Sequence, residues 1–79
     1  MQARDAKLLE TFGRSIRSAR KKRGWNQDDL AVAAKLSRNY VSDIERGVRN
    51  PSLVALVRLS RALRVPLREL LEDVEPKVR

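Results

Sequence analysis

The chain has 79 residues, enough for one small domain whose core is near the lower limit for independent stability. It contains 18 Lys and Arg against 10 Asp and Glu, a formal net charge of +8, which favours nucleic acid as a partner over a membrane surface or a merely solvated basic protein. Because the sequence contains neither Cys nor His, we expect no enzyme, no metal site and no cofactor.

The first predicted helix begins within a charged stretch, MQARDAKLLE, which lacks the apolar run of a signal peptide. No segment approaches ~18 apolar residues, so we expect a cytoplasmic protein that makes no contact with a membrane. Between an N-cap at Asp5 and a C-cap at Gly24, apolar residues recur at helical spacing. They are Leu8, Leu9, Phe12, Ile16 and Ala19. Arg20 lies at the edge of this stripe and is expected to be partly buried.

Two short helices are predicted next. Asn26 caps residues 27–34, with Asp29 completing a capping box, and Ser37 caps residues 38–46. A connection of three residues between them is typical of a helix-turn-helix. Two helices joined by so short a turn cross at a steep angle. The second helix, residues 38–46, therefore packs one side against the rest of the domain and exposes the other side. The exposed side carries Asn39, Ser42, Asp43 and Arg46.

The remaining two helices are predicted after the loop VRNPSL. Asn50 or Ser52 is the N-cap of the fourth helix, which extends to about Leu63. Its inward residues are Leu53, Leu56, Leu59 and Leu63. A fifth helix opens at Pro66 and stops at Pro76. Its apolar residues are Leu67, Leu70, Leu71 and Val74.

The predicted fold class is all-α, with five helices in one domain over residues 1–79 and a core of about residues 5–74. Residues 27–46 resemble the helix-turn-helix of the phage-repressor and Cro-like (XRE-type) family, which has apolar or small residues at six matching positions. These are Leu30, Ala31, Ala34, Leu36, Val41 and Ile44. The resemblance extends from FGRSIRSARKKRGWNQDDLA through NPSLVALVRLSRALRVPLREL, and SRNYVSDIERGVRNPSL is most similar to the controller proteins of restriction-modification systems. It implies a five-helix, phage-repressor-like DNA-binding domain whose second and third helices form the helix-turn-helix.

One residue departs from the family pattern. Lys35 stands in the turn where the family often has Gly, and the turn there usually requires a positive φ. Lys can adopt this conformation at a cost on the order of 1 kcal/mol. We therefore expect the fold to survive, with an effect on the geometry of the turn and hence on the tilt of the third helix.

Base contacts are expected from the start of the third helix. A helix in the major groove reads base edges chiefly with its N-terminal residues, which favours Arg38 and Asn39, with Ser42 one turn further. Arg can hold guanine O6 and N7, and Asn can hold adenine N6 and N7, although both side chains could simply be solvated. Tyr40 lies toward the packed side, so its ring can be structural while its hydroxyl reaches a phosphate or its edge meets a thymine methyl.

Phosphate contacts are expected at both ends of the reading helix. For Gln27 the family resemblance implies a phosphate held by the side chain and by the N-terminus of its helix. Ser37 is expected to act mainly as an N-cap whose hydroxyl can also touch a phosphate. Arg46, Arg49 and Asn50 are expected to meet phosphates or, for an Arg, a narrow minor groove.

Three further residues have expected structural roles. The resemblance implies an ion pair between Arg20 and Glu45 that orients the third helix. Asp43 is expected to be solvated or to orient Arg46, with a contact to cytosine N4 as the alternative. Trp25 is expected in the core, because one tryptophan beside a helix end forms no stacking platform.

The fifth helix has more apolar surface than a short closing helix needs, so Leu67, Leu71 and Val74 are expected to form a two-fold dimer interface. The predicted function is a sequence-specific transcription regulator that binds a pseudo-palindromic operator as a homodimer, contacts RNA polymerase when it activates and needs no small-molecule effector. A restriction-modification controller is favoured. The alternatives are an antitoxin or a Cro-like phage repressor that regulates its own operon, and a nonspecific RNA or membrane-surface binder.

Overall fold

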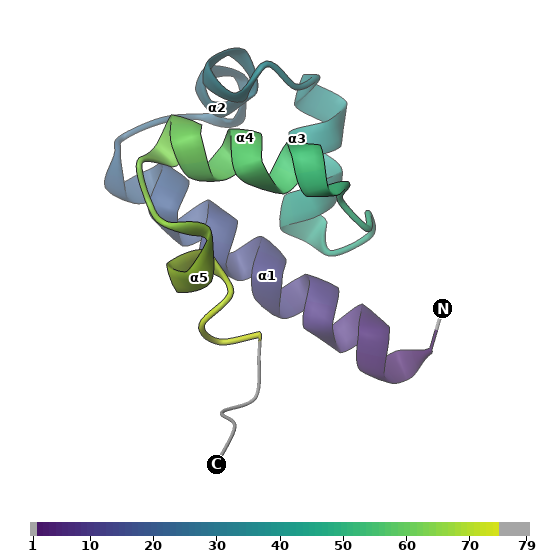
Figure 1. Ribbon diagram of the computed structural model, residues 1–79. Helices are drawn as coiled ribbons and strands as arrows, with labels where there is room; N and C mark the ends of the chain where they lie inside the picture. The colour runs from purple at the N-terminus through teal and green to yellow at the C-terminus, as the bar shows by residue number, and fades with distance from the viewer. Residues whose placement is uncertain (1, 75–79) are drawn as a thin grey trace.

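The computed structural model describes residues 2–74, and every regular element in this range is a helix (Figure 1). The helices are α1 (Ala3–Lys22), α2 (Gln27–Ala34), α3 (Arg38–Arg46), α4 (Leu53–Leu63) and α5 (Leu67–Leu70). The all-α prediction with five helices is therefore confirmed for the described part of the chain. None of the helices within residues 2–74 has the length and apolar composition needed to cross a lipid bilayer.

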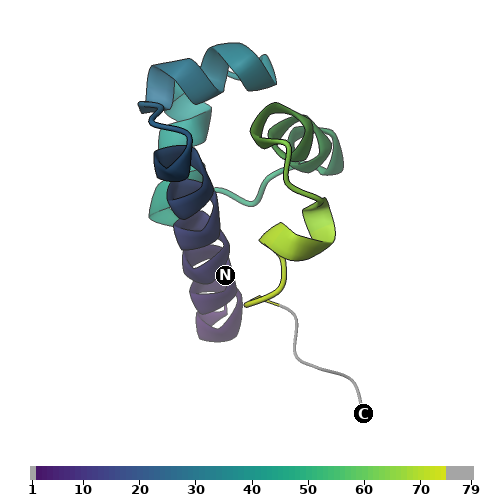
Figure 2. The same ribbon diagram turned by 90° about the vertical axis from the view of Figure 1, so that its left-hand side faces the viewer.

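The helices are arranged on two sides of the molecule. α3 lies against the long helix α1 on one side, and α4 lies with α5 on the other (Figure 2). α2 crosses above them and contacts both α3 and α4. α5 packs on α1 and α4, away from α3 (Figure 1). This arrangement covers the inner side of α3 and leaves its outer side open.

A cluster of apolar side chains fills the space between the helices. Its buried members are Phe12, Ile16, Leu30, Ala31, Ala34, Val41, Ile44, Leu59, Leu63 and Leu70. Full burial of each large apolar side chain contributes ~1.5–3 kcal/mol, so this cluster is the main source of stability. Trp25 packs at the edge of the cluster, partly buried, with the Arg23 guanidinium 4.3 Å from its ring centre.

Two glycines allow α1 and the end of α3 to approach closely. A Cβ on Gly13 would lie 2.5 Å from the carbonyl oxygen of Ile44 and 2.6 Å from that of Glu45. Gly47 has a φ of 76°, and a Cβ there would lie 2.7 Å from the Cα of Glu10. Any larger residue at these positions would therefore have to displace backbone.

Polar N-caps start α2 and α4. Asn26 Oδ1 accepts the N–H of Asp29 at 2.8 Å, and Asp29 Oδ2 accepts the N–H of Asn26 at 2.9 Å, so the predicted capping box is confirmed. At α4 the cap is Ser52, whose Oγ accepts the N–H of Ala55 at 3.1 Å. Asn50, the other predicted candidate, remains in the loop and is exposed.

The ends of α1 differ by a few residues from the prediction. The helix begins at Ala3 after Gln2, so Asp5 lies within the first turn, where a negative charge favours the helix N-terminus. At the other end the C-cap is Arg23. Gly24 follows it with a φ of 73°, the left-handed conformation that commonly comes just after a helix.

The fifth helix is shorter than predicted. Regular helix ends at Leu70, and residues 71–74 form turns in which the N–H of Val74 donates to the carbonyl of Leu71 at 3.0 Å. So short a helix has few backbone hydrogen bonds of its own, so its extent depends on what it packs against. Pro76, which was predicted to end it, lies outside the described residues.

Two leucines predicted to face inward are exposed. Leu53 is 71% exposed, and Leu8 is 42% exposed. The buried stripe of α4 runs instead through Ala55, Leu59 and Leu63, and Leu53 lies about 200° round the helix from Ala55. The prediction for Leu53 was wrong because a small residue, Ala55, occupies the inner side of the first turn.

Candidate nucleic-acid interface

The connection between α2 and α3 fixes how the two helices cross. Lys35 has φ 57° and ψ 44°, the left-handed conformation predicted for this turn. The N–H of Leu36 donates to the carbonyl of Ala31 at 2.9 Å and closes α2 as in a Schellman motif. Ser37 then caps α3 by accepting the N–H of Tyr40 at 3.0 Å. These bonds define the predicted helix-turn-helix.

α3 has a buried side and an open side. Val41 and Ile44 are 0% and 1% exposed, and they hold the inner side of the helix against the core. On the open side Arg38 and Asn39 are exposed in the first turn, and Ser42 is half-buried one turn later. The structure therefore places these three predicted base-reading residues where a major groove could meet the helix.

Arg38 makes an ion pair that the sequence had not suggested. Its Nε lies 3.2 Å from Oδ1 of Asp28 in the first turn of α2, and the two side chains are 65% and 66% exposed. An exposed pair of this kind adds ~1 kcal/mol or less to stability, but it gives the guanidinium a preferred direction. The contact depends on the crossing angle of α2 and α3, which no sequence pattern gives.

Tyr40 links α3 to the beginning of α4. Its hydroxyl accepts the N–H of Ser52 at 3.1 Å, and the guanidinium carbon of Arg49 lies 4.6 Å from its ring centre. This is a cation–π distance, and the ring is half-buried. The hydroxyl accepts in this bond and still has its own proton to donate. Tyr40 can therefore keep its structural role and donate a hydrogen bond to DNA.

The residues after Tyr40 that were predicted to meet phosphates come together at the end of α3. Asp43 Oδ1 accepts from Nη2 of Arg46 at 3.2 Å, and Asp43 Oδ2 lies 3.9 Å from Nη2 of Arg49. Asp43 thus orients both arginines. For Arg46, this orientation was one of the predicted alternatives. Asn50 is exposed in the same loop.

A buried ion pair joins α1 to α3. Arg20 Nε donates to Glu45 Oε2 at 2.7 Å and Arg20 Nη2 to Glu45 Oε1 at 3.0 Å, with the side chains only 9% and 3% exposed. Arg20 Nη1 also donates to the carbonyl of Trp25 at 2.7 Å. The hydrogen bonds to Glu45 raise the pKa of Arg20, which keeps the buried guanidinium charged. The pair fixes α3 on the long helix.

Gln27 belongs to the same hydrogen-bond group. It is the first residue of α2, and its Nε2 donates to Glu45 Oε1 at 3.2 Å. The only contact that sequence analysis predicted for this side chain was with a DNA phosphate. A primary amide has a second N–H and a carbonyl oxygen, so the half-buried Gln27 retains polar groups beside the N-terminal amides of α2.

The predicted dimer residues are less exposed than expected. Leu67, Leu71 and Val74 are half-buried and pack against the core. Leu71 and Val74 nevertheless contribute to a small apolar groove of about 110 Å³. The other lining residues are Leu8, Leu9, Phe12, Asn50, Pro51 and Leu56. Pro51 of this groove is followed in the sequence by two exposed apolar residues, Leu53 and Val54.

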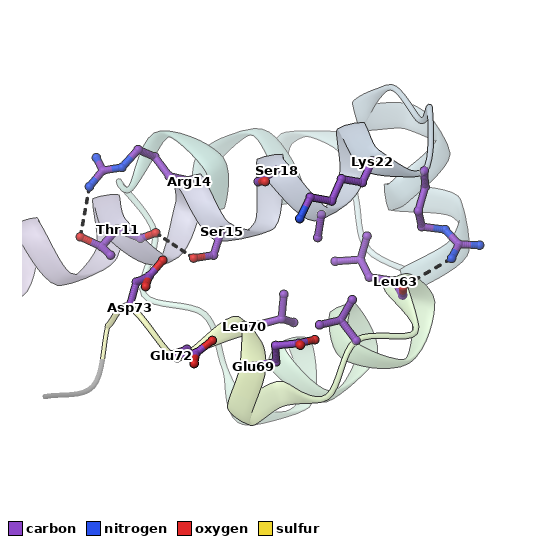
Figure 3. Close-up of a pocket in the computed structure, with 13 residues that line it drawn as sticks. Thr11, Arg14, Ser15, Ser18, Lys22, Leu63, Glu69, Leu70, Glu72 and Asp73 are labelled. Atoms are coloured by element: carbon purple, nitrogen blue, oxygen red, sulfur yellow. Dashed lines mark hydrogen bonds between the residues drawn. The ribbon is translucent and has the colours of Figure 1, made fainter. Parts of the chain in front are cut away.

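A larger groove of about 580 Å³ lies between α1 and the region of α5 (Figure 3). α1 contributes Arg14, Ser15, Ser18 and Lys22 to it, and the opposite wall carries Glu69, Glu72 and Asp73. All of its lining residues come from residues 11–23 and 63–73, so it is separate from the open side of α3. Sequence analysis did not predict this groove, because its two walls come from segments far apart in the chain.

Two short helices that cross at a three-residue turn, with a polar outer side on the second, define a helix-turn-helix domain. The chain belongs to the HTH_3 helix-turn-helix family, whose model matches residues 16–70. The control protein C.BamHI of Bacillus amyloliquefaciens is 44% identical to it over 62 residues, which are 77% of this chain and 76% of C.BamHI. The predicted resemblance to restriction-modification controller proteins is confirmed.

Solved structures agree with this assignment. The restriction-modification controller protein C.AhdI from Aeromonas hydrophila has a TM-score of 0.77 and 44% identity, covering 78% of this chain and 94% of its own. The controller C.Esp1396I, solved as a tetramer in complex with its natural 35 base-pair operator, has a TM-score of 0.75 and 33% identity, covering 85% and 88%. Other relatives are longer: the chain spans 41% of a Bacillus subtilis transcriptional regulator that is 46% identical over 62 residues.

Proposed function

We propose that this protein is a sequence-specific DNA-binding transcriptional regulator that binds a pseudo-palindromic operator as a homodimer and controls a restriction-modification system. The observation that carries the proposal is the open polar side of α3, held on α1 by the buried pair of Arg20 and Glu45. The 44% identity with C.BamHI and the likeness to C.Esp1396I on its operator support it. The net charge of +8 provides attraction to phosphates.

In this proposal α3 enters the major groove and reads base edges with its open side. Arg38 donates to guanine O6 and N7, and Asn39 pairs with adenine N6 and N7. Ser42 reaches a base one turn further along the helix. The hydroxyl of Tyr40 donates toward the DNA while it accepts the N–H of Ser52.

Phosphate contacts position the domain on the duplex. Gln27 and the N-terminal amides of α2 hold one phosphate, and the hydroxyl of Ser37 touches another. Beyond α3, Arg46, Arg49 and Asn50 meet the backbone. Asp43 orients the two arginines before the DNA arrives.

Two copies associate through the apolar surface beside the C-terminal end of the described chain. Leu67, Leu71 and Val74 form this interface, and the groove that Leu71 and Val74 share with Leu8 and Pro51 extends it. A two-fold axis makes the interface self-complementary and places the two α3 helices about 34 Å apart. Operator half-sites should therefore repeat at about 10 to 11 base pairs.

Regulation follows from the concentration of the protein. When the protein occupies operator DNA that covers the promoter, it represses transcription. Activation of transcription requires a contact between the protein and RNA polymerase. The proposal involves neither catalysis nor a small-molecule effector. It places the protein in the cytoplasm and at the nucleoid when it is bound to DNA.

Footprinting on the DNA upstream of its own gene tests the proposal. We expect two protected half-sites with related sequences in opposite orientation, close to a promoter. The flanking genes should encode a restriction enzyme and a methyltransferase. Protection that is independent of sequence would contradict specific recognition, and a neighbouring toxin gene would contradict the controller assignment.

A further inference from the structure

Asp28 places a carboxylate beside the residue that the proposed function uses to read a base. It is the second residue of α2, its side chain is 66% exposed, and its Oδ1 lies 3.2 Å from Nε of Arg38, the first residue of α3. A carboxylate near the phosphate backbone weakens binding to every DNA sequence by repulsion. Its position here therefore requires a separate benefit.

The geometry of the contact indicates that benefit. The Arg guanidinium has five N–H donors in a fixed planar fork. The contact of Asp28 with Nε leaves the terminal Nη groups available, and guanine offers O6 and N7 as a matching pair of acceptors. An exposed Arg otherwise loses much rotamer freedom on binding, so a guanidinium oriented in advance binds at a lower entropic cost.

We propose that Asp28 is a positioning residue that determines specificity by holding Arg38 in the orientation that reads guanine. This inference rests on the proposed function, because it requires α3 to lie in the major groove. It implies opposite effects on two kinds of DNA: the carboxylate improves discrimination at one base pair and weakens nonspecific binding. A negative charge in the first turn also stabilises α2, but that role alone leaves base preference unchanged.

Selection from duplexes with a randomised core, followed by sequencing of the bound fraction, measures base preference at each position. The wild-type protein should prefer guanine at one position in each half-site, and Arg38→Ala should abolish that preference. Asp28→Asn should reduce the preference about tenfold, while its affinity for a random duplex stays equal or rises. Asp28→Glu keeps the carboxylate and should restore most of the preference.

Asp43→Asn is the matched control. It also removes one negative charge near α3, but Asp43 contacts Arg46 and Arg49 and not Arg38. It should therefore change the affinity for all sequences alike and leave the guanine preference intact. On the Arg38→Ala background, Asp28→Asn should have no further effect on base preference. Thermal unfolding verifies that each variant is folded.

Three outcomes would overturn the inference. If Asp28→Asn keeps the full guanine preference while Arg38→Ala loses it, Asp28 does not position Arg38, and the proposed function stands. An equal loss in the Asn and Glu variants would show that the carboxylate is not what supports the guanine preference, because Glu keeps the carboxylate. A wild-type protein without preference at any position would refute the proposed function as well.

Discussion

Base reading can be tested at the scale of one residue with Arg38→Ala. The substitution removes a two-bond contact with guanine, so we expect binding to the operator to weaken by ~1–3 kcal/mol per half-site. Competition titrations of the operator against random duplex measure this loss. Equal losses on both duplexes would contradict base reading, because phosphate contacts carry no base identity.

The buried ion pair predicts a large effect on stability. Glu45→Ala leaves the guanidinium of Arg20 without its carboxylate in a place where its side chain is only 9% exposed. We expect the free energy of unfolding to fall by ~3–5 kcal/mol, a large fraction of the stability of a small domain. Urea unfolding measures the change. A variant as stable as the wild type would show that the pair contributes little.

Residue pairs close in sequence or implied by the family were predictable, whereas pairs set by helix crossing were not. The capping box of Asn26 and Asp29 follows from spacing alone. The contacts of Asp28 with Arg38 and of Gln27 with Glu45 join different helices. Their distances depend on how α2 and α3 cross, which hydrophobic periodicity does not specify.

At the scale of elements, the packing of α1 on α3 can be tested with Gly13→Ala. The added methyl would lie within 3 Å of backbone oxygens of α3, so the helices would have to separate. We expect a loss of ~1–3 kcal/mol in the free energy of unfolding, visible in thermal melting.

Gly24→Ala is the control for this prediction. A Cβ at Gly24 would have no atom within 4 Å, so any loss there comes from its φ of 73° alone, at ~1 kcal/mol. If Gly13→Ala is no more destabilising than Gly24→Ala, the close approach of the helices is not required.

The sequence predicted which helices form better than where they end. Caps and apolar periodicity located all five helices of residues 2–74. The prediction failed at the last one because residues 71–74 form turns, and Asp73 and Val74 line a groove together with residues of α1. Helix propensity does not predict such packing. It also failed at Leu53, whose exposure depends on the rotation of α4 about its own axis.

At the scale of the whole molecule, two substitutions test the proposed dimer. Val74→Asp and Leu8→Asp each place a charge in the apolar groove and should shift sedimentation equilibrium toward the monomer. Val32→Asp is the control, because Val32 is 79% exposed on α2 and lines no part of that groove. If all three variants stay dimeric and folded, the interface lies elsewhere.

The charge of the assembled dimer predicts the salt dependence of binding. With ~8 to 10 phosphate contacts, the slope of log affinity against log salt concentration should be near minus 7 to minus 9. Titrations of the operator over a series of salt concentrations give the slope. A slope near half that value would indicate that one subunit alone contacts the DNA.

Because α1 and the end of α3 approach so closely at Gly13 and Gly47, we expect the two helices to move as one rigid body. Sliding or rotation of one helix against the other would open this packing. In a dimer, flexibility toward operators of unequal half-site spacing would then have to reside at the joint between subunits. Each subunit would carry its reading helix as a fixed part, and only the distance and angle between the two copies would adapt to the DNA.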